Sequence, residues 1–119
     1  MSKKRVEEYI PIALKVLGDE FENGKIPSEY NGYISAFGAG IIQSGLKPTI
    51  AIYENKSAST KSEKDRLTKI ILKIIDKDTK EKSLLKYVIN SKEDESFLKE
   101  KIKDASIAIK LAIRTFEKA

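Results

Sequence analysis

The sequence contains no cysteine, no histidine and no tryptophan in its 119 residues. Without cysteine and histidine, the chain lacks the usual zinc ligands, thiol nucleophiles and imidazole bases of enzymes. Only carboxylates, lysine, tyrosine, serine and threonine remain to do chemistry, and none of them shows a catalytic spacing. We therefore expect a binding protein and not an enzyme, with no catalytic residue, no metal site and no cofactor.

Long apolar runs are also missing from the chain. Because no run reaches about 18 apolar residues, no membrane span is expected. The basic residues 1–5 are not followed by an uninterrupted apolar core, so a secretory signal is not expected either. Together with the lack of cysteine, these absences predict a cytoplasmic protein without a membrane partner. The length suits one domain with a real core, so residues 1–119 are predicted to form a single domain.

Charged residues are abundant but unevenly placed. The chain has 23 Lys and Arg against 18 Asp and Glu, a net charge of +5. Residues 1–60 carry seven of each sign, so the whole surplus lies in residues 61–119. A basic half favours an anionic partner such as nucleic acid, although solubility alone explains a mild excess. Since twenty of the cations are lysine, such a contact should reach the phosphate backbone more than the bases.

Apolar residues recur at three- and four-residue spacing along nearly the whole chain, which is typical of amphipathic helices. Helix-start signals occur at Ser28, at Thr60 in a Thr-x-x-Glu capping box, and at Ser91. A β-strand over residues 50–53 is the alternative for one short segment, but it has no evident pairing partner. The predicted fold is all-α, a compact bundle of about six helices over residues 3–22, 28–44, 48–55, 60–75, 80–89 and 93–117.

Glycine and proline are few, and several of them gather in residues 35–56. Gly45 suits a left-handed helix end and Pro48 suits the first turn of the next helix, so a tight hinge between two helices is predicted. The Gly-Ala-Gly sequence at 38–40 gives the preceding helix a face of small residues. This face serves either close packing inside the bundle or a binding surface. It is not a dinucleotide-binding motif, because the third glycine is absent and no strand precedes it.

The helix predicted over residues 60–75 carries a row of cations beside its apolar face. The cations lie three or four residues apart, so they form one stripe about 120° from the centre of the apolar face: Arg66, Lys69, Lys73 and Lys77. Such a stripe is either a solvated helix face or a ridge that tracks phosphates. Under the second interpretation, Arg66, Lys69 and Lys73 are candidate RNA-backbone contacts.

The last predicted helix is apolar nearly all the way round between residues 105 and 113. Within it, Ile107 and Leu111 lie outside the centre of the main apolar stripe. Such a helix is either central in its own bundle or covered by a second protein. Leaving Ile107 and Leu111 exposed would forgo about 1.5–3 kcal/mol each, so both are candidate protein-interface residues.

Residues 42–56 resemble a motif of the small helical subunit of the type III-B CRISPR RNA-targeting complex, the Cmr complex. That family shows asparagine or serine, then Gly-Leu, two variable residues, and an apolar Thr-Leu-Ala-Phe-like helix that ends near a lysine. Here, residues 44–53 read Ser-Gly-Leu-Lys-Pro-Thr-Ile-Ala-Ile-Tyr. Arg5 ahead of Tyr9 is similar to the family's first helix, and residues 107–116 are similar to its last.

The resemblance implies a non-catalytic small subunit of an antiviral RNA-silencing complex. Copies would stack into a filament beside the backbone subunits and line the groove for target RNA, touching guide or target RNA through its backbone. From aligned positions, the resemblance adds Lys56, Arg5 and Arg114 to the candidate RNA contacts. The alternative is a helical protein–protein scaffold without nucleic-acid contact, whose lysines only solvate the surface. A small carboxylate-dependent hydrolase is a third hypothesis, which no residue spacing supports.

Overall fold

Six helices make up most of the described chain, which comprises residues 2–55 and 61–118 of the computed structural model. Their bounds are α1 Lys3–Glu20, α2 Glu29–Ser44, α3 Leu46–Tyr53, α4 Lys61–Ile75, α5 Leu84–Asn90 and α6 Glu95–Ile113. Two short strands, β1 (Lys25–Ile26) and β2 (Glu117–Lys118), pair in parallel. The predicted all-α class is therefore confirmed. Over these residues, no helix is both long and apolar enough to cross a membrane.

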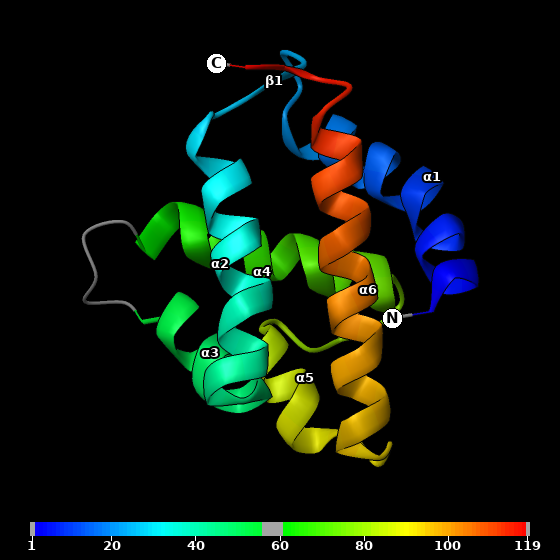
Figure 1. Ribbon diagram of the computed structural model, residues 1–119, viewed down its shortest axis with the longest axis vertical. Helices are drawn as coiled ribbons and strands as arrows, with labels where there is room; N and C mark the ends of the chain where they lie inside the picture. The colour runs from blue at the N-terminus through cyan, green and yellow to red at the C-terminus, as the bar shows by residue number, and fades with distance from the viewer. Residues whose placement is uncertain (1, 56–60, 119) are drawn as a thin grey trace.

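Helix α6 is central to the arrangement, with α1 on one side and α2 on the other (Figure 1). Helix α4 crosses behind α2 and α6 and contacts both of them as well as α1. Helices α3 and α5 pack against each other and against α4, at the end of the bundle where α6 begins. The β1–β2 pair closes the opposite end and joins the C-terminal segment to the turn after α1.

The buried apolar side chains form a cluster with members from all six helices. Leu17 of α1, Phe37 of α2, Ile50 of α3, Ile70 of α4 and Ile109 of α6 each have no exposed surface. Burying a side chain of this size contributes about 1.5–3 kcal/mol. This core fixes the helices relative to one another, and it thereby fixes which helix faces, with their charged residues, lie side by side.

The hinge predicted between the second and third helices is present at Gly45. Its φ of +99° lies in a region that L side chains rarely adopt, so the turn requires glycine. Helix α3 begins immediately afterwards at Leu46, and Pro48 lies in its first turn as predicted. The strand alternative for residues 50–53 is wrong, because these residues complete α3.

The two glycines of the small-residue face of α2 have different surroundings. A Cβ at Gly40 would lie 3.0 Å from both Oγ1 and Cγ2 of Thr49, so Gly40 allows α2 and α3 to pack closely. A Cβ at Gly38 would meet nothing within 4 Å. The packing interpretation is therefore confirmed at Gly40, whereas Gly38 borders open space.

The observed helix starts agree only in part with the predicted ones. Ser28 precedes α2, but its side chain makes no capping hydrogen bond, and Thr60 lies outside the described residues. The fifth helix begins at Leu84, four residues later than predicted, because the Oγ of Ser83 accepts the N–H of Lys86 at 3.1 Å. A serine cap of this kind satisfies one of the free N–H groups of the first turn.

Both ends of α6 also differ from the prediction. The N–H of Glu93 donates to the Oγ of Ser91 at 3.0 Å, so a turn precedes the helix, which begins at Glu95. The helix stops at Ile113 instead of residue 117. Residues 117–118 leave the helical path to pair with β1, and this long-range pairing has no signal in the local sequence.

Candidate nucleic-acid interface

Arg66, the first cation of the predicted stripe on α4, is held by α1. Its Nε donates to Oε1 of Glu20 at 2.9 Å, and its Nη2 donates to the backbone carbonyl of the same residue at 2.6 Å. The guanidinium also lies 4.2 Å from the ring centroid of Phe21. Arg66 therefore ties α4 to the C-terminal end of α1, and a carboxylate already balances its charge.

Lys69 and Lys73 continue the stripe as exposed side chains, each beside a carboxylate. The Nζ of Lys69 lies 3.3 Å from Asp65, and that of Lys73 lies 3.2 Å from Glu20. Burial opposes the ionisation of Glu20, but hydrogen bonds from Arg66 and Lys73 outweigh it and hold the pKa of Glu20 below its usual value. Exposed ion pairs contribute only about 0–1 kcal/mol. These lysines could therefore exchange a carboxylate for a phosphate at small cost.

Two lysines that were not predicted extend this surface. Lys82 and Lys86 line, together with Lys69, a depression of about 420 Å³ beside α3, α4 and the start of α5. Glu54 and Asp65 line the same depression, so its net positive charge is small. Among the described residues, no group of three or more acidic side chains is placed to hold a metal ion.

Arg5, predicted from its aligned position, is bound to a buried carboxylate. Its Nη1 donates to Oδ2 of Asp104 at 2.7 Å, and Asp104 has no exposed surface. The other carboxylate oxygen accepts the N–H of Ser2 at 3.2 Å. The guanidinium carbon of Arg5 lies 5.2 Å from the centroid of the Phe97 ring. Arg5 therefore anchors the start of α1 on α6.

The remaining predicted RNA contacts are Lys56 and Arg114. Lys56 lies outside the described residues. Arg114 is exposed and follows the last residue of α6. It continues the line of the outer face of α6, on which no other cation was predicted.

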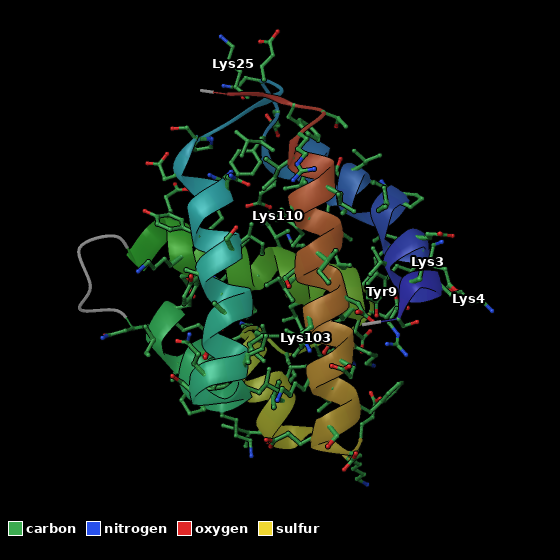
Figure 2. All side chains as sticks on the ribbon, viewed as in Figure 1. Lys3, Lys4, Tyr9, Lys25, Lys103 and Lys110 are labelled. Atoms are coloured by element: carbon green, nitrogen blue, oxygen red, sulfur yellow. The ribbon has the colours of Figure 1, made fainter. Side chains whose placement is uncertain are left out.

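Helix α6 carries its own row of cations, which we call the α6 row: Lys99, Lys103, Lys110 and Arg114. At about 100° per residue, these four positions fall within about 60° of one another, and they span about 22 Å of helix. Ala105 and Ala112, which are buried, lie on the opposite side of the helix. Figure 2 shows Lys103 and Lys110 on the front of α6, on the side toward α2.

The α6 row meets less opposing charge than the stripe on α4. The Nζ of Lys103 pairs with Glu100 at 3.2 Å, whereas the other three members form no ion pair with any residue in the described ranges. The neighbouring helix α2 has no charged side chain after Glu29. The wall of α2 that borders Lys103 and Lys110 is therefore uncharged, and cations outnumber acidic side chains along this face.

A groove of about 250 Å³ lies between α2 and α6. Lys103 and Lys110 line its α6 side, and Ile107 lies between them along the helix. The α2 side is formed by small or apolar residues, namely Ile34, Ser35, Gly38, Ala39 and Ile42. The groove therefore combines two cations with an apolar, uncharged lining.

The two predicted protein-interface residues occupy different places. Ile107 is half-buried in the wall of the groove. Leu111 is 38% exposed on the outer surface of α6, and Ile42 at the end of α2 is 68% exposed. Leu111 lies one helical turn from Ile107, and exposed apolar side chains near one another are typical of surfaces that contact another protein.

The sequence of this helical bundle matches the model of one protein family. The model of the family described as CRISPR-associated protein (Cas_Cmr5) matches residues 3–107. The chain belongs to this family. The match runs from α1 into α6, so the resemblance first noted over residues 42–56 is confirmed over most of the chain. Comparisons with curated proteins and with solved structures gave no match.

As a member of the Cmr5 family, the chain is a small structural subunit of the type III-B Cmr complex and associates with other subunits of that complex. The family match includes Lys103 and Ile107 but ends before Lys110 and Arg114. The C-terminal half of the α6 row therefore lies beyond the matched range, and its placement comes from the structure of this chain.

Proposed function

We propose that this Cmr5-family subunit is non-catalytic and lines the path of target RNA, which it holds by the phosphate backbone. The observation that carries the proposal is the α6 row, four cations on one helix face, of which Lys103 and Lys110 border the uncharged wall of α2 and only Lys103 has an ion-pair partner within the described ranges. A cation without a carboxylate partner can bind a phosphate without first losing an existing contact. The counterions that the RNA releases then favour binding.

Lysine predominates in the α6 row, which fits contact with the backbone of the RNA. Lysine acts as a compact point charge, whereas a planar guanidinium is better suited to paired hydrogen bonds with a base edge. Arg114 is the single arginine of the row and lies at its end. We therefore expect binding that depends strongly on salt and weakly on RNA sequence.

The cations predicted on α1 and α4 have a different part in this proposal. Lys69 and Lys73 are exposed and could form a second, weaker RNA contact, which Lys56 would extend. Arg66 and Arg5 stabilise contacts between helices, because Arg66 holds the half-buried carboxylate of Glu20 and Arg5 holds the fully buried carboxylate of Asp104. A phosphate contact by either arginine would have to replace that bond.

Copies of the chain are further proposed to stack along the complex beside the backbone subunits. The exposed side chain of Leu111 and the open side of Ile107 support a protein contact close to the α6 row. Stacking would place several α6 rows in series. Weak contacts in each copy would then add up through the high effective concentration of linked sites.

The test of RNA binding compares two double variants in the assembled complex. Lys103→Ala with Lys110→Ala removes the middle of the α6 row, in which only Lys103 has a carboxylate partner. Lys69→Ala with Lys73→Ala removes two exposed lysines that both have carboxylate partners. Each lost phosphate contact lowers the slope of log affinity against log salt by about 0.7, so the α6 variant should lose about 1.4. The α4 variant should lose less.

The outcomes separate the competing functions. Unchanged RNA affinity and salt slope in both variants, with normal complex assembly, would favour the protein–protein scaffold. A loss in the α4 variant alone would place the RNA path on α4. The non-catalytic assignment would be contradicted if the purified chain showed nuclease activity and a single carboxylate substitution abolished that activity.

A further inference from the structure

The groove between α2 and α6 has features that a purely electrostatic contact does not require. Its lining is mostly apolar, and Ile107 lies between the two lysines of its α6 side. Its volume of about 250 Å³ is smaller than that of sites for drug-sized ligands, which begin at about 300 Å³. The groove therefore suits one small, flat group with an anion on each side.

We propose that this groove binds one unstacked nucleobase of single-stranded RNA, while Lys103 and Lys110 hold the phosphates on either side of it. The inference rests on the proposed RNA path along α6. It adds a base contact to that path and names the form of the ligand, a nucleotide outside a continuous stack.

The lysine spacing supports this arrangement. Lys103 and Lys110 are seven residues apart, so their Cα atoms are separated by about 10 Å along α6. Ile107 lies between them, where its apolar side chain can cover the face of a base. Ser35 and Ser106 line the groove, and the exposed hydroxyl of Ser35 can bond to the edge of a base without selecting one base strongly, whereas that of Ser106 already donates to the backbone carbonyl of Lys103.

The α2 side of the groove supports close approach by the ligand. Gly38 has no side chain, and a Cβ there would meet nothing within 4 Å. Ala39 adds only a methyl group. A flat ring can therefore approach the backbone of α2, and the phosphates meet two lysines and no acidic lining residue. An acidic helix of another protein would also meet the lysines, but a groove of about 250 Å³ is too small to take up a row of helix side chains.

A base can enter the groove only when it has left the stack. Sequence-independent proteins that bind single strands combine a positive groove with flat contacts to successive bases, and these contacts tolerate every base. A regular duplex keeps its bases paired inside. The α2–α6 groove should therefore favour single-stranded or locally unstacked RNA over a continuous duplex.

The test fills the groove while keeping its charges. Gly38→Leu places a side chain in the open space of the groove, and Gly32→Leu places the same side chain on an exposed part of α2 outside it. Neither position has an atom within 4 Å of the added Cβ, so both variants should fold. In both, leucine is also a better helix former than glycine.

The probe is target RNA that carries 4-thiouridine, whose photoreactive group is on the base itself. After irradiation of the assembled complex, the tryptic peptide 104–110 of the wild-type chain should carry RNA adducts. Gly38→Leu should lower their yield by about fivefold or more, consistent with the loss of a base contact. Gly32→Leu should leave the yield unchanged, and both variants should keep the salt slope of RNA binding.

Three results would overturn the inference. The first is that peptide 104–110 carries no base adducts although the Lys103→Ala, Lys110→Ala double variant still lowers RNA affinity. Only a contact with the RNA backbone would then remain. Loss of a partner subunit from the Gly38→Leu complex, with adducts retained, would make the occupant a protein. An unchanged adduct yield in Gly38→Leu would place the base elsewhere. If the lysine variants also leave RNA affinity unchanged, the proposed RNA path fails as well.

Discussion

Replacing Arg5 by alanine should destabilise the fold strongly, because it leaves a buried carboxylate without its main partner. Asp104 has no exposed surface, and its Oδ2 accepts the Arg5 guanidinium at 2.7 Å. After the substitution, the carboxylate of Asp104 keeps the hydrogen bond from the N–H of Ser2 at 3.2 Å. The contact of Arg5 with the Phe97 ring would also be lost.

The expected cost follows from the burial of the pair. Breaking a buried ion pair from one side typically costs about 3–5 kcal/mol, because an uncompensated charge remains. The side chain of Arg5 is 26% exposed, so water can reach the site once it is removed, and we expect a value near the lower limit. With a urea m-value of about 1.5 kcal/mol per molar, a loss of about 3 kcal/mol lowers the unfolding midpoint by about 2 M.

Urea unfolding of four proteins isolates this interaction: the wild-type chain, Arg5→Ala, Asp104→Asn, and the double variant. In the Asp104→Asn background no carboxylate remains to be left unpaired, so Arg5→Ala should cost only about 1 kcal/mol there. Equal costs in both backgrounds, or a loss below about 0.5 kcal/mol in the wild-type background, would refute the reasoning.

Two further substitutions test the packing and electrostatics of the fold. Gly40→Ala should lower the free energy of unfolding by about 1 kcal/mol in thermal melts, because overpacking against Thr49 outweighs the gain in helix propensity. The control Gly32→Ala should be neutral or stabilising, because an added Cβ there meets nothing within 4 Å. Burial raises the pKa of Glu54 above its ordinary 4.5, although hydrogen bonds from Thr68 and the backbone of α5 oppose the shift. The protonated carboxyl therefore favours the folded state, and that contribution is lost as pH rises through the folded pKa. Glu54→Gln should be more stable than wild type at pH 7, and its advantage should disappear below pH 4.5; an advantage that is independent of pH would contradict this account.

The helical fold was predictable because its signals are local. The three- and four-residue spacing of apolar side chains indicates the helices, and Gly45 with Pro48 indicates the turn between α2 and α3. The late start of α5 at Leu84 could also have been found, since Ser83 lies directly before it. The early end of α6 could not, because β2 pairs with a strand about 90 residues earlier in the chain.

The candidate site was only partly predictable. The stripe on α4 was visible in the sequence, but Arg66 bonds to Glu20, 46 residues away, and such a partner has no local signal. The α6 row was not predicted from the sequence, because Lys103 and Lys110 lie within a helix that is otherwise apolar on most sides. Their shared face follows from the seven-residue spacing, but only the packing of α2 beside α6 shows that this face borders an uncharged groove.

Lysine footprinting of the assembled complex, with and without target RNA, tests whether the RNA runs along α6. Acetylation by a small amine-reactive reagent reports the accessibility of each Nζ, and mass spectrometry assigns it to a residue. Target RNA should protect Lys103 and Lys110 more strongly than Lys69 and Lys73. Unchanged reactivity of Lys103 and Lys110 when RNA binds would contradict an RNA path along α6.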